Sequence, residues 1–235
     1  MNERPNFFLY SLFAATIFAL FAFGGYALLG GLNDDSDDTA ARDVQVITDN
    51  DTTTDDPAVV TEGIDTGRGT IIDPPRALQD FTLLDDDNTP LSRSDLEGKY
   101  VLMVFGYTHC PDVCPANLLE FRRIKRDLGD LAENVTFLFI SVDGERDTPE
   151  LLNLYLQRYD PEFIGMSGTQ EELDRIADDY GLEYSYVNAE NSRAGYTVIH
   201  TASRFLIDPQ GQLIRLYSFT TDATAITEDL ISLIQ

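Results

Sequence analysis

Basic side chains are scarce in this sequence of 235 residues. It has 16 lysines and arginines against 41 aspartates and glutamates, and its formal net charge is −25. Binding to the phosphate groups of nucleic acid requires a basic patch, which this composition does not supply. The composition therefore excludes nucleic acid as a partner.

Charged side chains are absent altogether from residues 7–32. As a helix, this run would extend about 39 Å, and the hydrocarbon core of a bilayer is about 30 Å thick. The competing interpretation is a cleaved signal peptide, but the apolar core of such a peptide is shorter than this run. We therefore expect a single transmembrane helix over residues 7–32.

Basic groups flank this helix unequally. Arg4 and the α-amino group precede it, and the next basic residue after it is Arg42. The more positive flank of a membrane segment tends to stay in the cytoplasm. We expect residues 1–6 to form a short cytoplasmic N-terminus and the rest of the chain to lie on the extracytoplasmic side of the cell membrane.

Apolar periodicity is missing from residues 33–75. This stretch has twelve acidic side chains and only two arginines. Such a composition does not bury enough apolar surface to offset the entropy lost on ordering. The sequence predicts an acidic, disordered linker that self-repulsion keeps extended.

Residues 76–235 alternate between two kinds of pattern, which predicts an α/β domain. Two short, nearly continuous apolar runs are typical of strands buried on both faces. Helix starts are marked by capping residues and by proline in the first turn. We expect strands at 81–84, 89–91, 100–107, 135–142, 197–207 and 212–219, and helices that start near Pro115, Pro149, Thr169 and Asp222.

Cysteine is nearly absent, yet both cysteines lie in one segment, FGYTHCPDVCP, at residues 105–115. Cys110 and Cys114 follow the first buried strand and precede a helix, and this end of a strand is where α/β proteins place their chemistry. A structural disulfide would close a very short loop and contribute only roughly 2 kcal/mol. Thiol–disulfide exchange is the second interpretation, because a helix N-terminus stabilises a thiolate. A soft-metal site is the third.

Histidine is equally scarce, with His109 and His200 the only two. His109 is adjacent to Cys110, but the side chains of neighbouring residues need not point at the same ion. His109 is also consistent with a loop histidine that binds no metal. His200 lies in a predicted strand and is the better third ligand. Two thiolates and one imidazole suit Cu(I) and also accept Cu(II), whereas structural zinc usually takes four protein ligands.

Three segments of the sequence resemble the landmarks of the Sco/SenC family. They are, in chain order, GYTHCPDVCP, SVDGERDTPE and YTVIHTASRFLIDPQG. The resemblance covers roughly residues 78–235, and it implies a thioredoxin-like fold behind an N-terminal membrane anchor. It also implies that Cys110, Cys114 and His200 are the copper ligands.

The family handles copper during cytochrome c oxidase assembly, so the resemblance implies a metallochaperone. The implied partners are oxidase subunit II, with its dinuclear CuA site, and other assembly factors that handle copper or thiols. The family also reduces cysteines, and Cys110 and Cys114 would then be a redox-active pair. Two departures stand out: Gly144 replaces a frequent proline, and Ile199 replaces a frequent acid.

Two alternatives to copper delivery stay open. One is a thiol–disulfide oxidoreductase that carries no copper. The other is a thiol peroxidase of related fold, whose pattern PxxxTxxC places threonine three residues before the cysteine. Here Thr108 is two residues before Cys110, and Met103 stands where the proline would align.

Overall fold

The structure is a computed structural model that describes residues 64–65, 68–188 and 195–235. The expected N-terminus, the expected anchor at 7–32 and most of the expected linker lie outside these residues. Among the helices that are described, none combines the length and apolar character needed to cross a bilayer.

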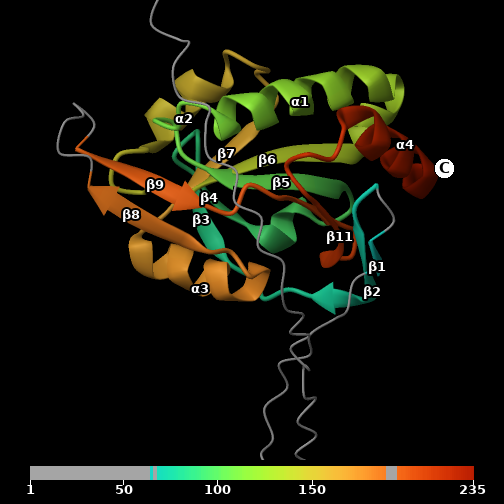
Figure 1. The fold of residues 1–235 in the computed structure, drawn as a ribbon, viewed down its shortest axis with the longest axis horizontal. Helices are drawn as coiled ribbons and strands as arrows, with labels where there is room; N and C mark the ends of the chain where they lie inside the picture. Colours follow the sequence, from blue (N-terminus) through green and yellow to red (C-terminus); the bar gives the residue numbers. More distant parts are fainter. Residues whose placement is uncertain (1–63, 66–67, 189–194) are drawn as a thin grey trace, which may run out of the picture. The chain divides into compact units, whose positions relative to one another are not determined.

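A nine-stranded mixed sheet organises the domain (Figure 1). Its centre is parallel: β5 pairs with β6 along its whole length, and β6 pairs with β7. The remaining strands add in antiparallel fashion in the order β1-β2-β11-β10-β5-β6-β7-β3-β4. The strands are β1 (Ile64–Asp65), β2 (Thr70–Ala77), β3 (Thr82–Asp85), β4 (Pro90–Ser92), β5 (Tyr100–Gly106), β6 (Val135–Ser141), β7 (Ile164–Ser167), β10 (Arg204–Ile207) and β11 (Gln212–Tyr217).

Helices cover both faces of this sheet. Figure 1 shows α1, α2 and α4 on one face and α3 on the other. This arrangement explains why the central strands are apolar throughout, because a strand covered on both faces has no polar side. The helices are α1 (Val113–Leu128), α2 (Pro149–Leu156), α3 (Gln170–Tyr180) and α4 (Ala223–Ile234).

Local sequence signals set the helix ends as expected. The Thr148 side chain caps α2, with Pro149 in the first turn. Thr169 and Glu172 form the predicted capping box of α3, and Gly181 ends this helix in the left-handed region at φ 61°. These residues satisfy backbone groups that a helix end leaves unpaired, and glycine adopts positive φ without a steric penalty.

The start of α1 differs from the prediction. The helix begins at Val113, with Asp112 as its N-cap residue, and not at Pro115. Proline is tolerated within the first turn because the amide groups there have no intrahelical acceptor. Cys114 therefore lies inside the first turn of α1.

The predicted strand at 197–207 is wrong as a single element. Residues Tyr196–His200 form β9, which pairs with β8 (Tyr184–Asn188) and with no other strand in the described part of the chain. Residues Arg204–Ile207 form β10 of the main sheet. No proline or glycine marks the break at residues 201–203, so the sequence does not show that the two halves pair with different partners. We refer to the two-stranded sheet of β8 and β9 as the β8–β9 ribbon.

The predicted boundary between linker and domain at residue 76 is also too late. Strand β2 begins at Thr70 and pairs with β11 at both of its ends. Pro74 and Pro75 lie between the two paired stretches, where the ladder uses no backbone donor. At least residues 70–75 therefore belong to the folded domain.

Candidate metal centre

The two cysteines occupy the turn between β5 and α1. Cys110 lies in the loop, Cys114 lies in the first turn of α1, and both are free thiols with buried side chains. Gly106, the last residue of β5, makes room for the second sulfur. A Cβ atom at Gly106 would lie 2.8 Å from Cys114 Sγ and 2.7 Å from the Phe139 ring, so only glycine leaves the thiol its place.

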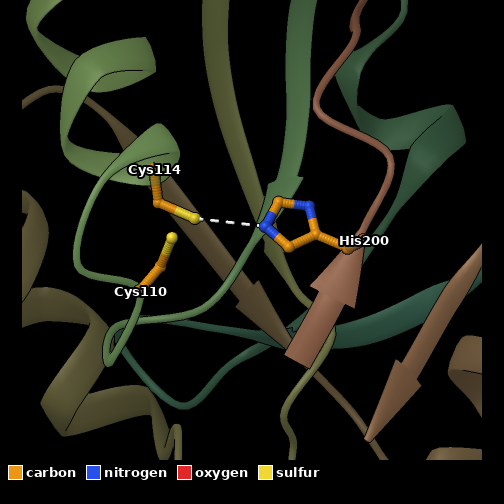
Figure 2. A group of neighbouring side chains, drawn as sticks. All are labelled: Cys110, Cys114 and His200. Carbon is orange, nitrogen blue, oxygen red and sulfur yellow. Dashed lines mark hydrogen bonds between the residues drawn. The ribbon is translucent and has the colours of Figure 1, made fainter. Parts of the chain in front are cut away.

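His200 approaches the cysteines from the other side, at the end of β9 (Figure 2). Its Nε2 lies 3.4 Å from Cys114 Sγ, and its Nδ1 lies 2.9 Å from the carbonyl oxygen of Thr201. A carbonyl oxygen only accepts hydrogen bonds, so Nδ1 carries a hydrogen. In the neutral ring, Nε2 then keeps its lone pair and is the nitrogen able to bind a metal ion.

The three side chains converge on one point. The two Sγ atoms and one ring nitrogen all lie within 4.8 Å of one another. The structure thus brings together all three residues that the sequence singled out. His109 does not join them: its half-exposed ring turns Nδ1 toward Thr108 Oγ1, at 3.0 Å.

The two thiols differ in their acid strength. A hydrogen bond from the Cys114 thiol lowers the pKa of Cys110 to about 3 and outweighs burial, which acts in the opposite direction. The same hydrogen bond raises the pKa of Cys114, and burial adds to this rise. These opposite shifts favour a state in which the pair shares one proton and the thiolate is on Cys110.

The buried carboxylate of Asp147 accepts hydrogen bonds from the loop that holds Cys110. Asp147 accepts hydrogen bonds from the Thr108 amide at 2.8 Å, the Thr108 hydroxyl at 2.6 Å and the Ser141 hydroxyl at 2.7 Å. Burial raises the pKa of Asp147, and the hydrogen bonds from Thr108 and Ser141 act against that rise. Asp147 thereby ties the residues just before Cys110 to the end of β6.

This donor set is suited to a soft metal ion. Two sulfurs and one imidazole nitrogen provide three ligands, which is the number and softness that Cu(I) favours. The described residues contain no further His, Cys, Asp or Glu within this group, so a tetrahedral structural zinc site is not complete here. The same two sulfurs are close enough to take part in dithiol chemistry.

The fold and the site together define a thioredoxin-like α/β protein with a paired-cysteine and histidine centre. A family model described as SCO1/SenC matches residues 70–235. The chain belongs to the SCO1/SenC family, and the resemblance of the three sequence segments is confirmed.

Individual relatives agree with this assignment. The mitochondrial SCO1 homolog 1 of Arabidopsis thaliana is 32% identical over 176 residues, which are 73% of this chain but 49% of that protein. The alignment thus spans about half the length of this relative.

Solved structures share the fold. ScoI of Bradyrhizobium japonicum with copper bound is 35% identical, has a TM-score of 0.61, and aligns over 66% of this chain and 98% of its own. Apo Sco1 of Thermus thermophilus in solution is also 35% identical, has a TM-score of 0.64, and aligns over 71% of this chain and 96% of its own.

The structure describes both departures from the family pattern. Ile199 is exposed on the β8–β9 ribbon beside His200. Gly144 packs so closely that a Cβ atom there would overlap the carbonyl oxygen of Gly168. The space that a proline ring would need at 144 is therefore filled by backbone in this chain.

Proposed function

We propose that this chain is a copper-binding protein whose cargo is held by Cys110, Cys114 and His200. The observation that carries the proposal is the convergence of two thiols and one imidazole nitrogen within 4.8 Å, from three separate elements. The ScoI relative of Bradyrhizobium japonicum was solved with copper bound, and this supports the choice of metal. Cu(I) suits the two thiolates best, and Cu(II) is accepted by the same ligands.

The recipient follows from family membership. The Sco/SenC family acts in cytochrome c oxidase assembly, so the proposed recipient is the CuA site of oxidase subunit II. The proposed location is a single-pass anchor at residues 7–32 in the cell membrane, with the copper site on the extracytoplasmic side. The part of the proposed linker that precedes β1, residues 33–63, would keep the domain within reach of a membrane-bound recipient.

Reduction of another protein's cysteines is the second candidate function. It is favoured by the unequal acid strength of the two free thiols. In one direction, reduced Cys110 attacks a partner disulfide as a thiolate and releases one partner thiolate. Cys114 then displaces the second partner thiol, so two electrons leave this chain and a Cys110–Cys114 disulfide remains.

His200→Ala separates the two functions. A metal ligand is lost in this variant, whereas the exchange steps use only the sulfurs. We expect oxidase assembly in cells to fail with His200→Ala, while the purified variant still cycles between dithiol and disulfide.

A thermal melt of the metal-free protein verifies that the variant folds. Normal assembly with His200→Ala, together with failure of both cysteine-to-serine variants, would assign the function to thiol chemistry. Normal assembly with all three variants would refute any role of this site.

A further inference from the structure

The β8–β9 ribbon holds His200 but is not part of the main sheet. In the structure as described, its two strands pair only with each other. A two-stranded antiparallel sheet has little stability of its own. Other contacts must therefore set the position of His200 relative to the cysteines.

Strand β8 is held by Tyr186, whose hydroxyl donates to the Val142 carbonyl oxygen at 2.7 Å. The contacts of β9 centre on Arg146, in the loop between β6 and α2. Its guanidinium carbon lies 3.6 Å from the centre of the Tyr196 ring, at the start of β9, and its Nη1 donates to the Tyr196 carbonyl oxygen at 3.1 Å. Arg146 also binds Asp143 Oδ2 through Nε and Nη2, each at 2.6 Å. The Tyr196 hydroxyl donates to the other oxygen of Asp143 at 2.7 Å.

These contacts form a closed unit that joins the loop to the ribbon. Asp143 is fully buried, so both of its oxygens depend on protein donors in place of water. A planar guanidinium supplies a two-pronged ion pair and a stacking surface at once, which a lysine does not. Arg146 contacts the Asp143 carboxylate, the Tyr196 ring and the Tyr196 backbone at the same time.

Contacts further along the ribbon extend this attachment toward the site. The Tyr107 hydroxyl lies 2.9 Å from Thr197 Oγ1, and the Tyr107 ring meets the His200 ring edge to face at 5.9 Å between centroids. The Arg146 guanidinium carbon lies 5.8 Å from the centre of the same Tyr107 ring. Arg146, Tyr107 and His200 are thus connected through adjoining rings.

The same loop also holds the cysteines, through Asp147. One short segment therefore reaches both halves of the site: Asp147 fixes the approach to Cys110, and Arg146 fixes the ribbon that bears His200. The geometry points to Arg146 as the positioning residue for His200. This inference rests on the proposed function, because it assigns a role in assembling the proposed copper site.

The test compares Arg146→Gln with Arg146→Lys in the full chain, with and without His200→Ala. Arg215→Gln is the matched control, because Arg215 is similarly buried and also ion-paired, but to Asp229 of α4. Three quantities are measured for each: Cu(I) affinity by competition with a chelator, the dithiol midpoint potential, and the melting temperature without metal.

Arg146→Gln should weaken Cu(I) binding by roughly 10- to 100-fold, the usual cost of losing a residue that orients a ligand. It should have no further effect when His200 is already alanine, because the ligand it positions is gone. The Cu(I) affinity of Arg146→Lys should lie between those of wild type and Arg146→Gln. The midpoint potential should stay within the range of the Arg215→Gln control.

A metal-free readout keeps the inference separate from the proposed function. Proton NMR should show a nuclear Overhauser contact between the Tyr107 and His200 rings in wild type, and Arg146→Gln should lose it. Loss of this contact supports the inference even if wild type binds no copper, in which case only the proposed function fails. The inference would be overturned if Arg146→Gln retained the contact between the Tyr107 and His200 rings or bound Cu(I) with wild-type affinity. It would also be overturned if Arg146→Gln lowered the Cu(I) affinity by the same factor when His200 is alanine. If the glutamine variant does not fold, the same criteria apply to Arg146→Lys.

Discussion

Lowering the pH distinguishes Cys110 from an ordinary thiol. An ordinary cysteine has a pKa near 8.5, so its thiolate fraction falls roughly 500-fold between pH 8.5 and pH 5.5. The hydrogen bond from Cys114 lowers the pKa of Cys110 to about 3, so Cys110 stays ionised over the same range. Because the thiolate is the species that reacts, its alkylation rate should change by less than about twofold.

The assay is alkylation of the reduced, metal-free chain with iodoacetamide, with mass spectrometry to locate the modified cysteine. The rate should be slow as well as flat, because nucleophilicity falls as the pKa falls. Cys114→Ala removes the donor, so it should restore a steep pH dependence, whereas Cys114→Ser keeps a hydroxyl donor and should keep the pH dependence shallow. A rate that falls tenfold per pH unit in wild type would refute the proton-sharing pair.

The same shifts predict how the stability of the reduced domain depends on pH. The pKa of Cys110 is lowered on folding. Its contribution to the free energy of unfolding is therefore present above the ordinary thiol pKa and is lost as pH falls toward about 3. The pKa of Cys114 is raised, so its contribution is present below the ordinary thiol pKa and is lost as pH rises above it. In thermal melts, the melting temperature of wild type should therefore exceed that of Cys110→Ala by most at intermediate pH, where the two cysteines share one proton.

Three further predictions concern the pocket, the redox state and the anchor. Gly106→Ala places a methyl group against Cys114 Sγ and should cost about 1–3 kcal/mol of stability by overpacking; an unchanged melting temperature and copper affinity would contradict the close approach. Oxidation of Cys110 and Cys114 to a disulfide should abolish tight copper binding, which titration of both redox forms checks; equal affinities would mean that the sulfurs are not ligands. Through residues 7–32 the chain should stay in the membrane fraction after carbonate extraction; a mature protein that begins after residue 32 would indicate a cleaved signal peptide.

Much of the fold was predictable because its signals are local. The buried strands β5 and β6 are read from apolar runs, and the starts of α2 and α3 from Thr148, Pro149 and the capping box at Thr169. The split between β9 and β10 was not predictable, because strand pairing is set by partners distant in the sequence. Strand β2 was missed for the same reason, since its pairing with β11 outweighs an acidic, proline-containing sequence.

The site shows the same division. Cys110 and Cys114 stand out because cysteine is so rare, and His200 because the sequence resembles a family. Their convergence required the fold, because β9 and the β5–α1 turn are far apart in sequence. Asp147 and Arg146 were missed, although both lie in the segment SVDGERDTPE. A charged loop usually indicates solvent exposure, and nothing local shows that Asp143 and Asp147 are buried.

The central claim is that Cys110, Cys114 and His200 form one metal site, and a Cu(I) titration of the reduced full chain tests it most directly. His109→Ala is the matched control, because His109 is the other histidine and lies outside the group. Wild type and His109→Ala should bind one equivalent tightly and with the same affinity, and each substitution at the three site residues should weaken binding strongly. Equal affinity in wild type and His200→Ala, or a loss in His109→Ala as large as in His200→Ala, would contradict the site.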